Sequence, residues 1–119
     1  MSRNKIKVRI QNPEEDLAIE TNAIIQDERI LYQEPDQTKT QYSFKNNILV
    51  RENKDIRMEY TFIKKKTTEG IIYLKDYNKE IRILINTKKI DKKDNNIKIQ
   101  YKVDNNEFIY EIEVIKWVY

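Results

Sequence analysis

Strict alternation of apolar and polar residues is the feature that most constrains how this chain can fold. Four segments alternate along their whole length: Lys5–Gln11, Thr38–Lys45, Ile56–Phe62 and Ile97–Val103. Such a period of two places one apolar and one polar face on a β-strand, the pattern of an antiparallel sheet with one solvated side. We therefore predict a β-strand at each of these four segments.

Six further segments are rich in residues that favour strands, above all in isoleucine. They are Leu17–Gln26, Arg29–Glu34, Asn47–Arg51, Gly70–Leu74, Glu80–Thr87 and Glu107–Trp117. About ten short strands at spacings of roughly 8 to 12 residues are typical of an all-β sandwich or barrel. The connections are too short for helical crossovers, so neighbouring strands should pair as hairpins. We predict a single all-β domain over residues 1–119, an antiparallel, mostly up-and-down barrel of about eight to ten strands.

The turns of such a protein must be built almost without glycine, because Gly70 is the only one in the chain. Several tight turns need a positive φ, and Asn and Asp are the other residues that tolerate it. Asn-Asn pairs separate strand candidates at 46–47, 95–96 and 105–106. The repeated Asp-Asn-Asn at 94–96 and 104–106 is therefore interpreted as two turns. The triplets do not fit the alternative of a calcium loop, which would need about six oxygen ligands, a glycine and a closing glutamate, because a predicted strand begins directly after each triplet.

One segment also fits a helix. Asn12 and Pro13 followed by Glu14 and Glu15 provide a cap, a proline in the first turn and acidic residues near the positive end of the helix dipole. A helix from 13 to about 25, or a helical turn at 13–16, is the alternative to a strand in this region.

The sequence lacks most of the groups that carry enzyme chemistry. It has no histidine and no cysteine, which removes imidazole bases, thiolate nucleophiles and the commonest zinc ligands. A single glycine excludes the glycine-rich phosphate loops. The acidic residues inside predicted strands, Glu20, Glu34, Glu59, Glu111 and Glu113, are interpreted as solvated or paired with lysines. We predict a protein that is not an enzyme, with no metal site and no cofactor.

Tyrosine is the unusual component of the predicted interior, since eight tyrosines stand against three phenylalanines. A buried tyrosine hydroxyl needs a hydrogen-bond partner. By their phase, Tyr42, Tyr60, Tyr73, Tyr101 and Tyr110 should line the same face as Thr38, Thr40 and Thr87. Such a semi-polar interior could hold one small molecule, or the tyrosines could fill a packed core.

Lysines form two clusters, Lys64–Lys66 and Lys88, Lys89, Lys92 and Lys93. The net charge of +3 is low for a dedicated nucleic-acid binder. We interpret the clusters as charged loops that keep sheet edges soluble. The alternative is a nucleic-acid surface that uses Lys64, Lys65, Lys66, Lys88 and Lys89.

The order of several short motifs resembles that of the YwiB-like family, small proteins of unknown function from low-GC Gram-positive bacteria. These motifs are Tyr32-Gln33-Glu34-Pro35, Thr38-Lys39-Thr40, Ile48-Leu49-Val50-Arg51, Tyr77-Asn78, Thr87-Lys88-Lys89-Ile90 and Ile97-x-Ile99-x-Tyr101. The resemblance runs over nearly the whole chain. It implies a lipocalin-like (calycin) barrel and no catalytic residues. The family glycines after Phe62 and Tyr77 are replaced here, by lysine and by Asn78.

These observations lead to a non-enzymatic barrel that binds a small molecule in its lumen. The residues predicted to line that site are Tyr32, Glu34, Thr38, Thr40, Arg51, Tyr60 and Tyr101. Arg51 and Glu34 would be the polar anchors, because charges beside a lumen need a partner or a ligand.

The oligomeric state and location are predicted only coarsely. We expect a monomer, or a homodimer joined through an exposed edge at the last strand, where Ile109, Ile115 and Trp117 lie opposite Phe108, Tyr110 and Ile112. No apolar signal region follows the first residues, and no segment reaches the roughly 20 apolar residues that span a bilayer. Together with the lack of cysteine, this favours a cytoplasmic protein without membrane partners.

Overall fold

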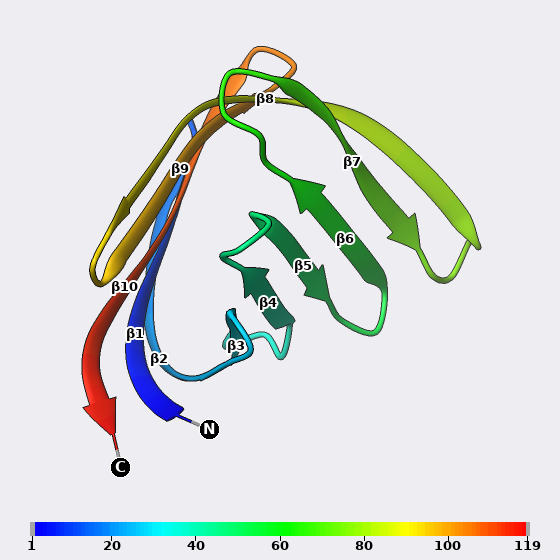
Figure 1. Ribbon diagram of the computed structural model, residues 1–119. Helices are drawn as coiled ribbons and strands as arrows, with labels where there is room; N and C mark the ends of the chain where they lie inside the picture. Colours follow the sequence, from blue (N-terminus) through cyan, green and yellow to red (C-terminus); the bar gives the residue numbers. More distant parts are fainter. Residues whose placement is uncertain (1, 119) are drawn as a thin grey trace.

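The computed structural model describes residues 2–118 and the side-chain surroundings of residues 4–115. Over the described chain it is built from strands, with no helix (Figure 1). The strands are β1 (Ser2–Gln11), β2 (Asp16–Gln26), β3 (Arg29–Gln33), β4 (Lys39–Ser43), β5 (Ile48–Glu52), β6 (Ile56–Thr61), β7 (Thr67–Leu74), β8 (Lys79–Lys93), β9 (Asn96–Val103) and β10 (Asn106–Val118).

The ten strands form one closed antiparallel ring in which each strand pairs with its neighbours in sequence. The ring closes where β1 pairs with β10, so that β1 lies between β2 and β10 (Figure 1). The predicted all-β, up-and-down barrel is therefore confirmed. From Ile109 to Glu113, β10 pairs with both β1 and β9, so this part of the last strand is not an edge. From Val114 onward β10 pairs with β1 alone, and the homodimer expected through this strand stays a prediction. The side chain of Trp117, named in that prediction, lies outside the described residues.

The structure decides one open alternative and differs from one local prediction. Residues 16–26 form the predicted strand, β2, and not the alternative helix, because their alternation is satisfied by pairing with β1. Before β2, the side chain of Asn12 accepts hydrogen bonds from the backbone N–H groups of Glu14 and Glu15, both at 2.9 Å, and this turns the chain without a helix. The second lysine cluster was expected in a loop, yet it lies within β8, where a bulge between Thr87 and Lys89 carries the strand onward to Lys93.

The prediction that Asn and Asp replace glycine at turn positions with positive φ is confirmed in part. Asn47, Asn78, Asp27 and Asp104 have positive φ, between 47° and 56°. Thus the second Asp-Asn-Asn triplet forms a left-handed turn at its aspartate. Glu28, Gln37 and Lys65 also have positive φ, from 61° to 72°, although their side chains are poorly suited to it. Lys65 and Asn78 lie in the two turns at which the resemblance to the YwiB-like family indicated a replaced glycine.

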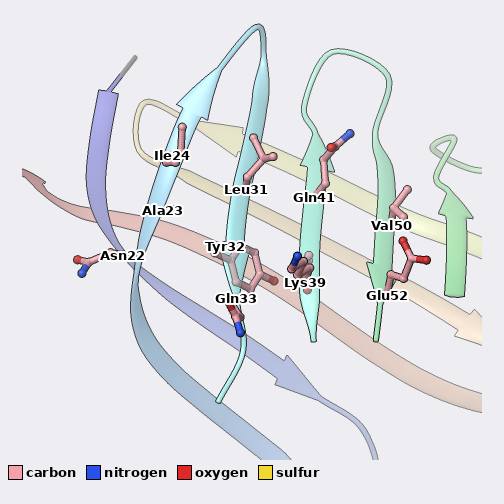
Figure 2. A pocket seen from close by; sticks show the side chains of 11 residues that line it. Asn22, Ala23, Ile24, Leu31, Tyr32, Gln33, Lys39, Gln41, Val50 and Glu52 are labelled. Carbon is pink, nitrogen blue, oxygen red and sulfur yellow. The ribbon is translucent and has the colours of Figure 1, made fainter. Parts of the chain in front are cut away.

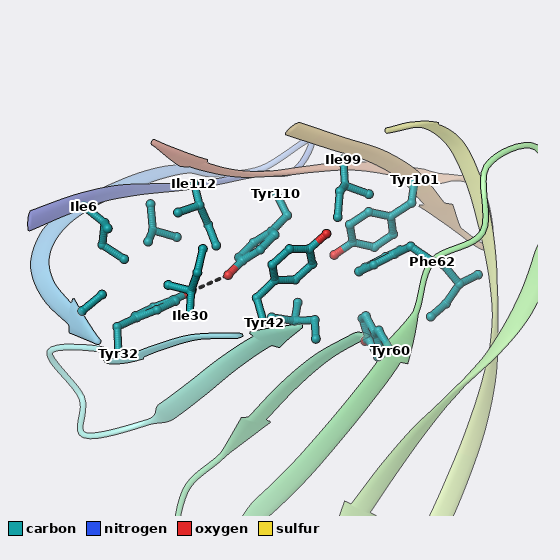
Figure 3. Close-up of a cluster of buried hydrophobic side chains, with 14 residues drawn as sticks. Ile6, Ile30, Tyr32, Tyr42, Tyr60, Phe62, Ile99, Tyr101, Tyr110 and Ile112 are labelled. Carbon is teal, nitrogen blue, oxygen red and sulfur yellow. Dashed lines mark hydrogen bonds between the residues drawn. The ribbon is translucent and has the colours of Figure 1, made fainter. Parts of the chain in front are cut away.

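The interior of the barrel is filled at its middle (Figure 3). Its most deeply buried large side chains include Tyr42, Tyr110, Phe62, Leu49 and Ile99. The ring of Phe62 lies 4.9 Å, centroid to centroid, from that of Tyr101.

Tyr73 does not belong to this interior, contrary to prediction. On β7 the inward row contains Gly70, which pairs with Tyr60, so the alternate residue Tyr73 faces outward opposite Arg57. Its hydroxyl donates a hydrogen bond to the side-chain oxygen of Asn78. The run Ile71-Ile72-Tyr73-Leu74 is apolar at every position, so its alternation could not indicate which side chains point inward.

Candidate functional site

A buried ion pair occupies the end of the barrel at which β3 ends and β4 begins. Glu34 follows β3 directly, and Arg51 lies near the end of β5. Arg51 Nε donates to Glu34 Oε2 at 2.9 Å, and Arg51 Nη2 donates to Glu34 Oε1 at 2.6 Å. Thr40 Oγ1 donates a third hydrogen bond to Glu34 Oε2 at 2.8 Å. Glu34, Thr40 and Arg51 are called the Arg51 cluster below.

The two partners of this ion pair differ in exposure. The side chain of Glu34 is 6% exposed, whereas that of Arg51 is 29% exposed. Burial alone would lower the pKa of Arg51, but the hydrogen bonds and charge of Glu34 outweigh burial and raise it. The guanidinium group therefore stays protonated, and its edge formed by Nε and Nη2 contacts Glu34. Its Nη1 group, by contrast, makes no hydrogen bond within the described residues.

Tyrosines surround the Arg51 cluster. The hydroxyls of Tyr32 and Tyr110 lie 2.6 Å apart and share a hydrogen bond across the interior, from β3 to β10 (Figure 3). Burial raises the pKa of both phenols, most strongly that of Tyr110. Arg51 is close enough to act electrostatically on both, since its charge partly offsets this rise in pKa. Both phenols are therefore neutral at physiological pH.

Tyr60 and Tyr101 present hydroxyls that are not used inside the protein. Their rings meet edge to face at 6.2 Å between centroids. Within the described residues neither hydroxyl has a hydrogen-bond partner, although Arg51 acts on the pKa of both. Thr87, which pairs with Tyr101 across β8 and β9, is 2% exposed, and its Oγ1 is also without a hydrogen bond in the described chain. A buried hydroxyl without a partner, as at Thr87, usually marks a site for water or a ligand.

Most of the predicted lumen residues do meet in one region. Glu34, Thr40 and Arg51 are in direct contact, and Tyr32, Tyr60 and Tyr101 lie within electrostatic range of Arg51. Thr38 lies at the margin: its backbone oxygen accepts from the N–H of Glu34 at 2.8 Å, while its hydroxyl accepts from Asn53 at 3.4 Å.

Tyr110 and Thr87 complete this region but were not predicted as site residues. Both had been placed on the inward face from their phase. The sequence does not indicate that Tyr110 contacts Tyr32, 78 residues away. That contact depends on how the barrel closes and how its strands tilt.

A shallow groove of about 640 Å³ runs along the outer face of β2 to β5, and the site residues Tyr32 and Thr40 are also part of its lining. Figure 2 shows that Ile24, Leu31, Gln41 and Val50 project from the outer faces of β2, β3, β4 and β5 along it. These four residues form one row through the sheet register. The groove therefore contains none of the unused hydroxyls described above.

The two lysine clusters lie side by side, at β8. Lys65 N donates to Thr87 O at 2.8 Å, and Thr87 N donates to Lys66 O at 3.1 Å. Two of the predicted nucleic-acid residues are paired with acids: Lys88 with Glu107 at 2.5 Å and Lys89 with Asp91 at 3.5 Å. Lys64, Lys65 and Lys66 are exposed, and none of them has an ion-pair partner in the described chain.

The described residues contain no group of three or more acidic side chains placed to hold a metal ion. They also contain no helix long and apolar enough to cross a membrane.

Comparison with known proteins supports the fold alone. No protein-family model matches the chain, and no curated protein matches it by sequence. Among solved structures, the chain is similar to the YwiB protein from Bacillus subtilis, with a TM-score of 0.57 and 15% sequence identity. The match covers 97% of this chain and 92% of that one. At this identity the likeness shows a shared barrel architecture, and the lipocalin-like subtype and the family membership stay predictions.

Proposed function

We propose that this chain is a non-enzymatic barrel that binds one small polar molecule beside Arg51. The observation that carries the proposal is a set of polar atoms without a hydrogen bond in the described chain: Arg51 Nη1 and the hydroxyls of Tyr60 and Tyr101, on which Arg51 acts electrostatically. Thr87 Oγ1, on the strand position paired with Tyr101, is a further one. Orienting polar groups set among aromatic side chains are the usual composition of a small-molecule site. Tyr60, Phe62, Tyr101 and Phe108 supply the rings.

The chemistry of these groups limits the ligand. Arg51 Nη1 can only donate, while each hydroxyl can donate or accept. The site therefore fits a molecule with at least one acceptor oxygen, such as a carbonyl, carboxylate or phosphoryl group. A strongly charged ligand is less suitable, because Glu34 already neutralises Arg51. The absence of histidine and cysteine from the sequence supports binding without catalysis and, through the lack of disulfides, a cytoplasmic location.

Native mass spectrometry of the protein purified gently from its own host tests this proposal. We expect a discrete small-molecule adduct that is lost on denaturation. The double variant Tyr60→Phe/Tyr101→Phe keeps both rings and removes both hydroxyls, and it should lose the adduct. The matched control is Tyr77→Phe, which removes an exposed hydroxyl elsewhere. A bare mass for the unmodified protein would mean that the tyrosines only fill the core. An adduct that the double variant retains would place the ligand elsewhere.

A second candidate function rests on the joined lysine surface. The backbone bonds between Lys65, Lys66 and Thr87 bring Lys64–Lys66 next to Lys88 and Lys89. Such a surface would bind the phosphates of single-stranded RNA or DNA, with an affinity that falls steeply as salt rises. The carboxylate partners of Lys88 and Lys89 weaken this candidate. No retention on single-stranded RNA or DNA at about 50 mM salt would end it.

A further inference from the structure

A second opening lies at the end of the barrel opposite the Arg51 cluster. The two ends are fixed by β4, which has Thr40 near its first residue and Phe44 directly after its last. The opening is a pocket of about 740 Å³, here called the end pocket. Ile30 and Ile112, 3% and 1% exposed, form its buried part. Its walls are the half-buried apolar side chains Ile25, Phe44, Ile97 and Val114.

Lys92 holds a positive charge over this apolar pocket. On β8 it pairs with Ile97, a residue of the inward row. Its Nζ donates to the backbone oxygen of Phe44 at 2.6 Å, which links β8 to the turn after β4 across the end of the barrel. Within the described residues no carboxylate lies within ion-pair distance of this ammonium group. Lys93 and Asp94 also line the pocket, so its three charged residues sum to one positive charge.

An apolar pocket whose charged lining residues sum to one positive charge selects for an amphipathic anion. The ammonium has three N–H donors, and the oxygen of Phe44 uses one. A carboxylate can therefore bond to Lys92 while the Phe44 contact persists. An apolar body would cover Ile97, Val114 and Phe44 and remove their surface from water. The volume lies within the range of small-molecule pockets, and one positive charge balances one negative charge.

We propose that the end pocket binds a small amphipathic monoanion, specifically a medium-chain carboxylate, with its chain on the isoleucines and its headgroup on Lys92. This site is separate from the polar site proposed beside Arg51. The buried side chains of Tyr42, Leu49, Tyr110 and Ile99 fill the barrel between the two ends. Either site can therefore exist without the other.

Calorimetric titration with decanoate and decan-1-ol, at concentrations below micelle formation, tests the proposal. Decanoate should bind the unmodified protein, and Lys92→Met should weaken that binding about tenfold, the effect of losing one charge-assisted hydrogen bond. Decan-1-ol should change by less than about twofold, because Met keeps the apolar stem. Lys92→Arg keeps the charge and should retain decanoate affinity. Lys7→Met, an exposed change of equal charge on β1, should leave both ligands unaffected.

Amide chemical shifts locate the bound decanoate. The expected result is that the largest shifts fall on Phe44, Lys92, Ile97 and Val114. The Tyr60→Phe/Tyr101→Phe variant should bind decanoate as the unmodified protein does, which separates this proposal from the one above. Absence of saturable decanoate binding would overturn it. So would equal affinities of the unmodified and Lys92→Met proteins, or shifts centred on Arg51, which would assign the anion to the polar site.

Discussion

Gly70 and Tyr60 face each other across β7 and β6, and the Tyr60 ring occupies the space that a side chain at position 70 would need. A Cβ at position 70 would lie 2.9 Å from Tyr60 Cδ1 and 2.8 Å from Ile85 Cδ1. Gly70 does not have a positive φ. The only glycine of the chain thus allows close packing inside the barrel and makes no turn.

We expect Gly70→Ala to lower the free energy of unfolding by about 1–3 kcal/mol through overpacking. Where the new methyl group has room, the same change stabilises a protein by about 0.4–1 kcal/mol. The sign of the change in unfolding free energy therefore shows whether a side chain at position 70 is crowded. Urea unfolding measures the effect. Ile85→Val removes the Cδ1 atom that lies closest, and the double variant should lose less stability than the sum of the single changes. Strict additivity would show that Ile85 is not the obstacle.

The ion pair between Arg51 and Glu34 should contribute more to stability than the other ion pairs of this barrel. Arg51→Leu leaves a carboxylate that is 6% exposed without its cation. Breaking a buried pair in this way typically costs about 3–5 kcal/mol, and we expect about 2–4 kcal/mol here because Arg51 is partly solvated. Denaturant unfolding checks this value.

Two variants make that measurement specific. Arg82→Leu breaks ion pairs to Glu69 and Glu80 in which every side chain is about half exposed, and it should cost less than about 1 kcal/mol. Adding Glu34→Gln to Arg51→Leu removes the unpaired charge and should restore part of the loss. If Arg51→Leu unfolds like Arg82→Leu, Arg51 belongs to the solvated surface and the polar site is wrongly placed.

Lys65 is strained where it stands. Its φ of 61° lies in the left-handed region, which costs a residue other than glycine about 1–2 kcal/mol. Lys65→Gly removes that strain but gives the unfolded chain more freedom, so we expect a net gain of about 0.5–1 kcal/mol in unfolding free energy. The matched change Lys66→Gly, in the same turn without a positive φ, should destabilise. Thermal melts of the two variants should therefore shift in opposite directions, and a shift in the same direction would refute the strain.

Asn47 shows why this reasoning does not extend to every left-handed position. Its φ is 55°, yet its side-chain oxygen accepts the hydrogen bond of the buried Tyr42 hydroxyl at 2.6 Å. Asn47→Gly would ease the backbone and leave that phenol without a partner. We expect a net loss of about 1 kcal/mol or more in a urea titration. An unchanged midpoint would mean that water replaces the amide.

The sequence predicts this fold well because alternation is a local signal with one global consequence. Each of the ten strand candidates corresponds to a strand, and short connections leave little choice but sequential pairing. Alternation gives a wrong prediction where every residue is apolar or where a bulge shifts the period. At Ile71–Leu74 every residue is apolar, so Tyr73 was assigned to the wrong face. At Thr87 a bulge breaks the period, so the second half of β8 looked like a lysine loop.

The residues of the candidate site could be predicted from the sequence, but the contacts between them could not. Glu34, Thr40 and Arg51 could be chosen as polar residues beside the lumen. Their hydrogen-bond geometry depends on how β3, β4 and β5 pair in register. The end pocket gave no sequence signal, because Lys92 belonged to an apparent surface cluster and reaches Phe44 only after the barrel closes.

Alkaline pH should unfold this protein cooperatively through its buried tyrosines. Burial raises the pKa of Tyr32, Tyr42, Tyr60, Tyr101 and Tyr110 above the ordinary value of about 10. Above about pH 10 the unfolded chain releases these protons while the folded chain retains them, so the unfolded state binds fewer protons and stability falls as pH rises. Below about pH 10 this contribution is fully present. Each such tyrosine can remove up to about 1.4 kcal/mol per pH unit.

Absorbance at about 295 nm and far-UV circular dichroism, followed from about pH 8 to about pH 12, measure the two events together. The five buried phenols should ionise only as the barrel unfolds, so the main rise in tyrosinate absorbance should coincide with the loss of the β signal. Tyr77→Phe removes a tyrosine that is 79% exposed, and it should reduce the absorbance change without moving the circular dichroism midpoint. If the five phenols ionise while the β signal persists, water reaches them in the folded state. The barrel would then be hollow around its tyrosines, and the filled middle that separates its two ends would be refuted.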